Sequence, residues 1–484
     1  MTLSAWSTAA SIRDAVAKGE ISCAEVARFF LDRIESLNPG LNAIITVTGE
    51  RALEAANGLD ERRAKGETLP PLAGVPVVVK DNLCAKGVKA TCGSRMLAGY
   101  VAQYDATVVS RLEADGALVL GKSNMDEFAM GSSGETSAFG PARNPWNRSL
   151  VPGGSSSGSA VAVSAGMAPL ALGSDTGGSV KQPAAFCGLV GLRPTYGRVS
   201  RYGLVAFASS LDQVGPLART VEDCALLFGA ISGADSRDST CLGLPPETAA
   251  VPPLEPRRLR VGLLAEQLEE NLDPAVREGV LKAAAILRDG GAELREILLP
   301  HASYALAAYY VIAPAECSAN LARYDGVRYG LRVDAPTAEE LAEATRSAGF
   351  GEEVTRRILT GTFVLSAGYR DAYYEKAVKA REVITLDFEK AFEQVDVLLG
   401  PTTPGPAFSL GALSGDPLSM YLCDVFTIPP NLGGFPSLSL PSGFTGEGLP
   451  VGAQLVGRRL QESLLLGAAA FLESGFGLNE RHPE

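Results

Sequence analysis

Histidine is almost missing from this 484-residue chain, which has only His301 and His482. Histidine is the usual base for a serine nucleophile, so a Ser–His–Asp site is not expected, and a reactive serine would need another proton acceptor. Basic residues are also scarce: 43 Lys and Arg stand against 55 Asp and Glu, giving a net charge of −12. This balance argues against wrapping a nucleic-acid backbone, although a partner in a complex could hold the nucleic acid.

The chain also lacks the patterns of a metal site, a disulfide framework or a membrane span. No C-x-x-C occurs, and no histidine neighbours any of the eight scattered cysteines, so we expect reduced thiols in a cytoplasmic protein. Residues 1–20 have no basic stretch followed by an apolar one, so no signal peptide is expected. The longest uncharged run, 149–174, is broken by Pro152, Pro169 and several glycines, which makes a poor spanning helix.

Short apolar runs alternate with helix-length stretches, a pattern that predicts an α/β fold with a mostly parallel or mixed sheet. The last two apolar runs predict an antiparallel hairpin at one side of the sheet. A capping box at Ser22 predicts a helix that Pro39-Gly40 ends. The expected strands are 74–79, 117–120, 170–172, 260–264, 395–400, 437–440 and 452–457, and the expected helices include 106–115, 274–289 and 368–395.

We expect one large domain over residues 1–484. Its parts are an N-terminal helical region (1–65), a core (66–240) and a C-terminal part that completes the sheet (257–484). The proline-rich segment 241–256 is expected to cross the surface of this domain rather than to separate two domains.

The chemically richest region is 150–190, which holds two glycine- and serine-rich loops around a short strand. Ser179 follows two glycines in the second loop and has the surroundings of a nucleophile. Such loops can cradle a phosphate, but neither fits a known nucleotide-binding motif. They can also form an oxyanion hole, here from the N–H groups of Thr176, Gly177, Gly178 and Ser179.

The proton acceptor for Ser179 must come from elsewhere. Asp175, with a usual pKa near about 3.9, is a weak base toward a hydroxyl. Lys80 and Lys122 each follow an apolar strand, and position alone does not choose between them. Lowering a lysine pKa from about 10.4 to about 7–8 costs roughly 4 kcal/mol, so a basic lysine needs dry surroundings. A serine of the cluster 155–157 could carry the proton.

Three stretches together resemble the amidase signature family: GGSSSGS (153–159), GSDTGGSVKQPAAFCG (173–188) and VKDN (79–82). The resemblance implies an α/β fold with a central mixed β-sheet covered by helices on both faces. It also implies a Ser–cis-Ser–Lys triad. Ser179 would be the nucleophile, Ser155 the bridging serine after a cis peptide bond, and Lys80 the base.

Further stretches, including 121–133, 191–216 and 424–444, are similar to one branch of this family, the glutaminase A subunits of tRNA-dependent amidotransferases. The resemblance implies that glutamine is hydrolysed through an ester on Ser179. Asp424 would hold the α-amino group of glutamine. Arg357 would hold its α-carboxylate, with Arg356, Arg219 and Arg370 as the other candidates.

That resemblance also implies a heterotrimer with B and C subunits. Ammonia would pass to a partner that uses ATP and Mg²⁺ to amidate mischarged tRNA, held mainly by the B subunit. No cofactor or metal is expected on this chain. The sequence does not decide between Asp-tRNA(Asn) and Glu-tRNA(Gln).

The match has three departures: Ser157 replaces a usual glycine, Lys181 a usual arginine, and Gly134 interrupts a stretch that more often reads Thr-Glu or Asn-Glu. Two other functions stay open. One is a stand-alone amidase for another small amide, and the other is a non-catalytic scaffold, against which the complete Lys80–Ser155–Ser179 set argues.

Overall fold

One mixed sheet of 11 strands runs through the computed structural model, which describes residues 2–268 and 271–483. The strand order is β1-β3-β2-β4-β6-β5-β10-β11-β9-β7-β8, so the two halves of the chain contribute to a single sheet. The strands are β1 Ile44–Val47, β2 Pro76–Lys80, β3 Leu118–Ser123, β4 Leu170–Asp175, β5 Val190–Arg193, β6 Gln213–Ala218, β7 Arg260–Leu263, β8 Glu293–Glu296, β9 Val397–Pro401, β10 Ser437–Phe444 and β11 Pro450–Gly457.

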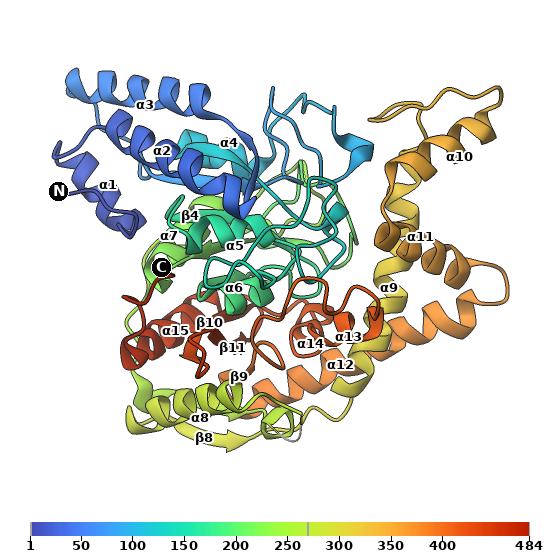
Figure 1. Cartoon of the computed structure of the whole chain (residues 1–484). Helices are drawn as coiled ribbons and strands as arrows, with labels where there is room; N and C mark the ends of the chain where they lie inside the picture. The colour runs from blue at the N-terminus through green and yellow to red at the C-terminus, as the bar shows by residue number, and fades with distance from the viewer. Residues whose placement is uncertain (1, 269–270, 484) are drawn as a thin grey trace.

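Helices surround this sheet, and α9 to α12 extend away from it at the right of Figure 1. None of the described helices is both long and apolar enough to cross a membrane. The helices are α1 Ala9–Ala17, α2 Cys23–Leu41, α3 Gly49–Ala64, α4 Thr107–Ala114, α5 Ser157–Ser164, α6 Lys181–Cys187, α7 Val221–Ile231, α8 Pro274–Asp289, α9 Ala305–Asn320, α10 Ala338–Gly349, α11 Glu352–Leu365, α12 Glu375–Gln394, α13 Pro417–Leu422, α14 Ile428–Leu432 and α15 Glu462–Phe476.

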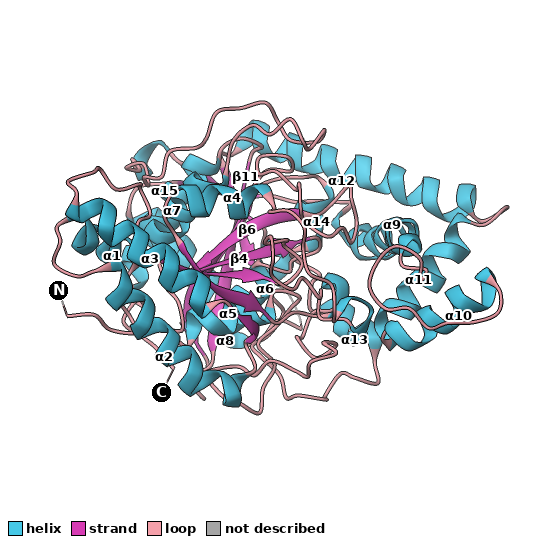
Figure 2. Cartoon of the chain, turned by 90° about the horizontal axis from the view of Figure 1, so that it is seen from above, coloured by secondary structure: helices cyan, strands magenta, loops and turns pink. Residues whose placement is uncertain are grey.

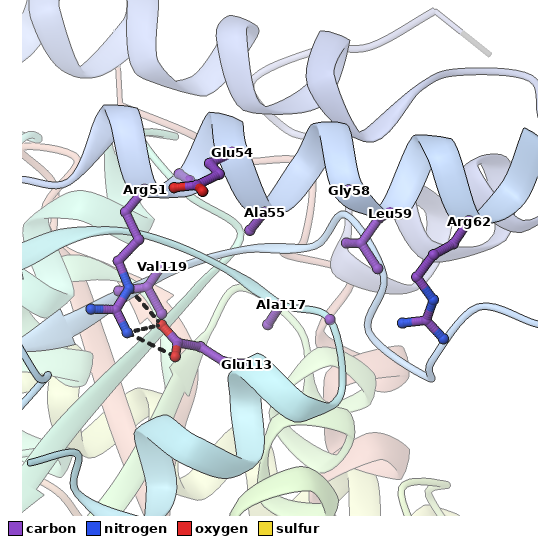
Figure 3. Close-up of a pocket in the computed structure, with 11 residues that line it drawn as sticks. Arg51, Glu54, Ala55, Gly58, Leu59, Arg62, Glu113, Ala117 and Val119 are labelled. Atoms are coloured by element: carbon purple, nitrogen blue, oxygen red, sulfur yellow. Dashed lines mark hydrogen bonds and ion pairs between the residues drawn. The ribbon is translucent and has the colours of Figure 1, made fainter.

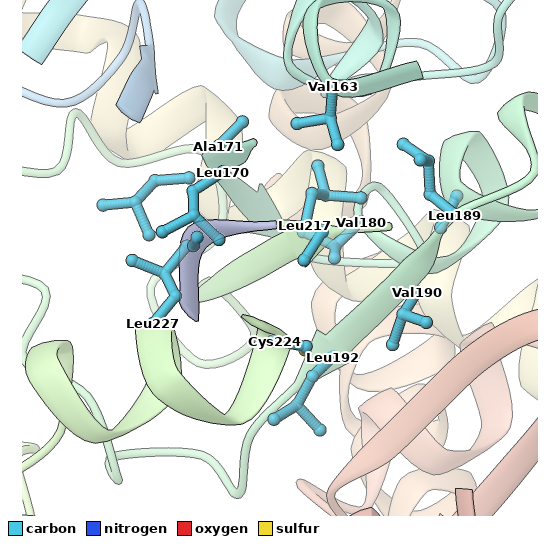
Figure 4. Close-up of a cluster of buried hydrophobic side chains, with 14 of the residues drawn as sticks. Val163, Leu170, Ala171, Val180, Leu189, Val190, Leu192, Leu217, Cys224 and Leu227 are labelled. Carbon is cyan, nitrogen blue, oxygen red and sulfur yellow. The ribbon is translucent and has the colours of Figure 1, made fainter. Parts of the chain in front are cut away.

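The main core lies between the sheet and the helices packed on its faces (Figure 2). Figure 4 shows Val163 of α5 and Leu227 of α7 on opposite sides of the central strands, with Leu217 of β6 between them. All three side chains are fully buried. Strands covered on both faces need apolar residues at successive positions, which explains the short continuous runs in the sequence. The predicted α/β fold with a mixed sheet is confirmed.

The central parallel strands place the chemistry. β2 is parallel to both β3 and β4, so the carboxyl ends of all three reach the same edge of the sheet. Lys80 is the last residue of β2, and Asp175 is the last residue of β4. In open α/β sheets, ligands bind outside the carboxyl ends of the strands.

Two predictions about elements were wrong. The β10–β11 hairpin is antiparallel as expected, but it lies inside the sheet, between β5 and β9, rather than at one side. Helix α2 runs past Pro39 to Leu41 and is capped by Asn42, whose φ is 49°. A proline in the last turn removes only one hydrogen bond, and the left-handed residue ends the helix.

Four strands were not predicted: β1, β5, β6 and β8. Strand β6 contains Gly215 and Pro216, and β8 reads ELRE, so neither has the apolar run of a buried strand. The proline-rich segment before β7 has no regular secondary structure over residues 241–255 and is mostly exposed or half-buried.

Candidate active site

Lys80 is completely buried and ends in a pocket of serine oxygens. Its Nζ lies 2.8 Å from Ser155 Oγ, 2.9 Å from Ser156 Oγ and 3.2 Å from the carbonyl oxygen of Ser174. The Gly154–Ser155 peptide bond is cis. These contacts join the end of β2 to the turn before α5, across 75 residues of sequence.

Burial lowers the pKa of Lys80 from 10.5 to about 7, although the negative charges of Asp126, Asp175 and Asp212 act in the opposite direction. At neutral pH about half of the Lys80 side chains are therefore uncharged, against about one in three thousand for a free lysine. The dry, hydrogen-bonded surroundings that a basic lysine requires are present at Lys80.

Lys122, the other lysine at a strand end, is in a different setting. Its Nζ forms a fully buried ion pair with Asp81 Oδ1 at 3.2 Å and also donates to the carbonyl oxygen of Lys89. The paired carboxylate keeps this lysine in a structural ion pair. Of the two candidates, only Lys80 contacts the serine cluster.

Ser179 lies beside this cluster and is 7% exposed. The backbone N–H of Ser156 donates to the carbonyl oxygen of Ser179 at 3.1 Å, which ties the two glycine- and serine-rich loops together. Among the described residues, no hydrogen bond joins the hydroxyls of Ser155 and Ser179. The structure thus brings Lys80 and Ser155 into direct contact and places Ser179 on the adjoining loop.

Asp175 is held as an anion by several groups. Burial would raise its pKa, but Lys181 and Arg193 outweigh burial and lower the pKa below the usual value. Asp175 Oδ2 also accepts from the backbone N–H of Val180, and Oδ1 from Asn431 Nδ2 at 2.6 Å. Asp175 therefore organises the Ser179 loop and is too weak a base to take the proton of Ser179.

Lys181, which departs from the family pattern, is fully buried. Its Nζ donates to Thr427 O, Asn431 Oδ1 and Gln454 Oε1 at 2.9–3.1 Å. Asn431 also donates to the carbonyl oxygen of Thr176. Three acceptors match the three donors of an ammonium group, so a lysine satisfies this position without the fork of an arginine.

The glycines of both loops are explained by close packing. A Cβ atom added to Gly154 would lie only 1.9 Å from Asp126 Oδ2. A Cβ atom added to Gly178, whose φ is 148°, would lie only 2.1 Å from Thr427 Oγ1. These contacts account for the glycines without a phosphate cradle. Among the described residues, none accepts a hydrogen bond from the backbone N–H groups of Gly177, Gly178 or Ser179.

Asp424 lies at the far side of the Ser179 loop and is 7% exposed. Its Oδ2 accepts a 2.5 Å hydrogen bond from Ser132 Oγ, whereas its Oδ1 is buried without a partner. Burial raises the pKa of Asp424 to about 7, against the lowering effect of Ser132. A buried carboxylate oxygen without a donor is costly and suits a cationic ligand.

Arg357, on α11, is 4% exposed and lies among aromatic rings. Its guanidinium is 5.2–5.6 Å from the ring centres of Phe207, Tyr310 and Tyr421. Its Nε pairs with Glu353 Oε1 at 2.7 Å, while no described residue hydrogen-bonds to its two terminal nitrogens. Planar terminal N–H groups of this kind suit a carboxylate.

The other three arginine candidates for binding a substrate carboxylate have partners or positions away from the site. Arg356 pairs at the surface with Glu352, and Arg219 donates to the carbonyl oxygen of Ser7 in the N-terminal part of the chain. Arg370 is exposed in the π-helical turn before α12. The buried arginine of α11 is therefore the one that faces the site.

A cavity of about 230 Å³ reaches the surface next to this site and is lined by Ser132, Arg357 and Tyr421, among other residues. A second cavity, of about 400 Å³, lies between α3 and β3, where Arg51 pairs with Glu113 (Figure 3). No residue of the candidate site lines that second cavity. The cavity beside Arg357 borders Ser132 and Arg357, whereas Lys80, Ser155 and Ser179 do not line it.

Neither histidine takes part in the site. His301 Nδ1 lies 3.0 Å from Asp387, and the His482 ring stacks on Trp6 at 4.0 Å. Among the described residues, no group of three or more His, Cys, Asp or Glu side chains is arranged to hold a metal ion.

Ser132 and Gln182 were not singled out from the sequence, and Ser156 was named only as a member of the cluster 155–157. Ser156 binds Lys80, Ser132 binds Asp424, and Gln182 links the two by donating to Ser132 O and accepting from Gly154 N. Ser156 and Gln182 belong to stretches that resemble the amidase signature, and Ser132 belongs to the stretch 121–133, which is similar to one branch of the family. Their roles depend on contacts between distant loops, which a linear motif does not contain.

The two remaining departures from the family pattern contact each other. A Cβ added to Gly134, whose φ is 83°, would lie 2.6 Å from Ser157 Cβ. The hydroxyl of Ser157 is buried without a partner. Ser157 therefore occupies the space that a larger residue at position 134 would need.

Comparisons with known proteins identify the family of this chain. The amidase family model matches residues 25–466. The A subunits of Glutamyl-tRNA(Gln) amidotransferase from a Synechococcus species and from Moorella thermoacetica are each 55% identical to this chain, over 98% and 99% of its length and 98% of their own.

Solved structures share the fold. The crystal structure of the A subunit of Glutamyl-tRNA(Gln) amidotransferase from Thermotoga maritima is 41% identical, with a TM-score of 0.84 and coverage of 100% of this chain and 99% of that one. A 6-aminohexanoate cyclic dimer hydrolase in complex with its substrate is 29% identical, with a TM-score of 0.84 and the same coverage. The chain therefore belongs to the amidase family.

Proposed function

We propose that this chain is the glutamine-hydrolysing subunit of a tRNA-dependent amidotransferase, acting through Lys80, Ser155 and Ser179. The observation that carries the proposal is the fully buried Lys80, with its Nζ 2.8 Å from the hydroxyl of Ser155. The two curated relatives, each 55% identical to this chain, carry an amidotransferase name and support the same reaction.

Neutral Lys80 takes the proton of Ser155, and Ser155 takes the proton of Ser179 as Ser179 Oγ attacks the side-chain amide carbon of glutamine. The carbonyl oxygen becomes an oxyanion, which the N–H groups of residues 176–179 stabilise. Their unpaired state at Gly177, Gly178 and Ser179 supports this role. The proton returns to the leaving nitrogen, the C–N bond breaks, and ammonia leaves a glutamyl ester on Ser179.

Water then attacks the ester. The same relay removes a proton from the water and returns it to Ser179 Oγ as glutamate departs. No side chain changes its net protonation over the cycle. The chain itself needs no metal or cofactor for these steps.

The free amino acid would be held at both ends. Its ammonium group would pair with Asp424 Oδ1, which has no partner among the described residues. Its carboxylate would bind the terminal nitrogens of Arg357, whose charge is already balanced in part by Glu353. An amide substrate without these two charges would leave Asp424 unpaired, which favours glutamine over other small amides.

The ammonia would pass to a B subunit that uses ATP and Mg²⁺ to amidate mischarged Glu-tRNA(Gln), Asp-tRNA(Asn) or both, in a heterotrimer with a C subunit. The net charge of −12 is consistent with tRNA binding by the B subunit. This chain would then contribute ammonia and no base-specific contacts.

The test uses the chain with its B and C partners, glutamine, ATP and mischarged tRNA. We expect glutamine-dependent amidation that Ser179→Ala abolishes, while amidation from added ammonium salts survives. Loss of both activities would contradict the division of labour between the partners. Efficient hydrolysis of aryl or aliphatic amides by the isolated chain, without glutaminase activity, would favour a stand-alone amidase.

A further inference from the structure

We propose that Ser156 is a positioning residue that directs the lone pair of Lys80 toward Ser155. This inference rests on the proposed hydrolysis at Ser179. The three consecutive serines 155–157 would then have three different roles: proton carrier, fixed acceptor, and a residue with no part in proton transfer.

The hydrogen bonds of Ser156 assign its hydroxyl proton to the carbonyl oxygen of Ser174. Ser156 Oγ lies 3.1 Å from the carbonyl oxygen of Ser174, which can only accept, and 3.3 Å from the backbone N–H of Ser174, which can only donate. A serine hydroxyl has one proton and two lone pairs. The structure gives the Ser156 proton to Ser174 O, and with the proton there Ser156 meets Lys80 Nζ, 2.9 Å away, as an acceptor.

Ser174 O is a second fixed acceptor for Lys80, at 3.2 Å. A neutral lysine has two protons and one lone pair. Its protons go to Ser156 Oγ and Ser174 O, so the lone pair faces Ser155 Oγ at 2.8 Å. Ser155 must then donate to Lys80, which is the direction that proton abstraction requires.

The same three partners also suit the protonated state. An ammonium group has three donors, and Ser155, Ser156 and Ser174 O supply three acceptors. When Lys80 gains its proton, only the hydrogen bond to Ser155 reverses. Proton transfer therefore has a single route and needs no rotation of the lysine.

The burial of these groups keeps the arrangement in place. Ser155 and Ser156 are fully buried at the start of α5, and Lys80 is fully buried at the end of β2. The titratable groups that act on Lys80 come from several elements and are Asp126 after β3, Asp175 at the end of β4, Asp212 before β6 and the Cys92 thiol. None of them hydrogen-bonds to Lys80 Nζ among the described residues, so the lone pair is aimed by Ser156 and Ser174.

The test compares Ser156→Ala with the matched control Ser157→Ala in the complete amidotransferase complex. Ser157 is the adjoining serine, and its hydroxyl has no partner. In Ser156→Ala, Lys80 has an N–H without an acceptor, and this N–H can turn to Ser155 in place of the lone pair. We therefore expect kcat for glutamine hydrolysis to fall about tenfold to a hundredfold, with KM changed by less than about threefold.

The pH profile separates this role from simple loss of packing. Protonated Lys80 loses one of three acceptors in Ser156→Ala, so the acid limb of kcat/KM should move to lower pH by about half to one unit. Ser157→Ala should keep the kcat and the acid limb of the unmodified protein. If Ser156→Ala does not fold, Ser156→Cys, a weaker acceptor of similar size, should give a smaller change in the same directions.

A folded Ser156→Ala protein with kcat within twofold of the original, or with reduced kcat and an unmoved acid limb, overturns the inference. Failure of the proposed function is distinguishable, because the unmodified complex would then lack glutaminase activity or Ser179→Ala would keep it. An active complex that depends on Ser179 but not on Ser156 contradicts only the positioning role.

Discussion

The substitution Asp424→Asn tests how the site recognises the α-amino group of glutamine. Asp424 is 7% exposed, its Oδ1 has no partner, and burial raises its pKa to about 7. A glutamine ammonium group placed at Oδ1 would favour the ionised form. Asparagine keeps an oxygen for Ser132 but removes the charge that the ligand needs.

The size of the expected change in the pH dependence of kcat/KM follows from two groups that titrate in the same pH range. Productive binding requires ionised Asp424 and neutral Lys80, and both have a pKa of about 7. Each requirement lowers kcat/KM about tenfold for each pH unit below the pKa, so the slope of log kcat/KM against pH should approach two well below neutrality. In Asp424→Asn only the Lys80 requirement remains, and the slope should fall to one.

At pH 8, where Asp424 is ionised, the substitution removes a hydrogen bond between charged groups. Such a bond contributes about 1.5–3 kcal/mol, so kcat/KM should fall about tenfold to a hundredfold, mainly through KM. The assay measures glutamate release by the complex at about seven pH values between roughly 5.5 and 8.5. Asp416→Asn, which removes an exposed carboxylate of the same segment, is the control and should keep the original slope.

A slope of two in Asp424→Asn, or a slope of one in the unmodified protein, would refute the reasoning. The first result would mean that another group supplies the second titration. The second would mean that Asp424 is not required as an anion when glutamine binds.

Three further predictions concern stability. Burial raises the pKa of Asp424 from 3.8 to about 7, so ionising this carboxyl in the folded protein lowers the free energy of unfolding. This destabilisation is absent below about pH 4 and reaches its full size above about pH 7. Asp424→Asn should therefore stabilise the fold by up to roughly 4 kcal/mol at pH 8 and little at pH 4 in melting experiments. Lys122→Met leaves Asp81 unpaired and should cost about 3–5 kcal/mol in denaturant unfolding, with kcat retained. Gly134→Ala should lower the free energy of unfolding less when Ser157 is also replaced by glycine, and a double-mutant cycle should give a difference of about 0.5–3 kcal/mol. Equal losses in the two backgrounds would contradict the close packing of positions 134 and 157.

Much of the fold could be predicted because its central strands are buried on both faces and need continuous apolar runs. This held for β2, β4 and β9, and helix α8 has the predicted bounds 274–289. Strand β8 could not be predicted in this way, because its sequence ELRE contains no continuous apolar run. The sheet order could not be predicted, since a strand's own sequence does not say which neighbours it pairs with.

The site was predicted in part. Signature motifs identify Lys80, Ser155 and Ser179 as a group, but strand-end position alone left Lys122 as an equal candidate to Lys80. The structure separates the two lysines by their partners, an aspartate for Lys122 and serine hydroxyls for Lys80. Ser156 looked the same as its neighbours until its hydrogen bonds were known.

The amino-acid sequence by itself determined that this chain has an α/β fold, has no histidine in its glycine- and serine-rich region 150–190, and carries the amidase signature motifs. These properties depend on residue type and local spacing. Only the tertiary structure decided which buried lysine contacts serine hydroxyls rather than an aspartate, which carboxylate oxygen lacks a partner among the described residues, and which second serine hydroxyl accepts from Lys80. Burial and hydrogen-bond partners depend on groups that are distant in the sequence, such as Lys80 and Ser155, 75 residues apart, and that meet only when the strands are assembled.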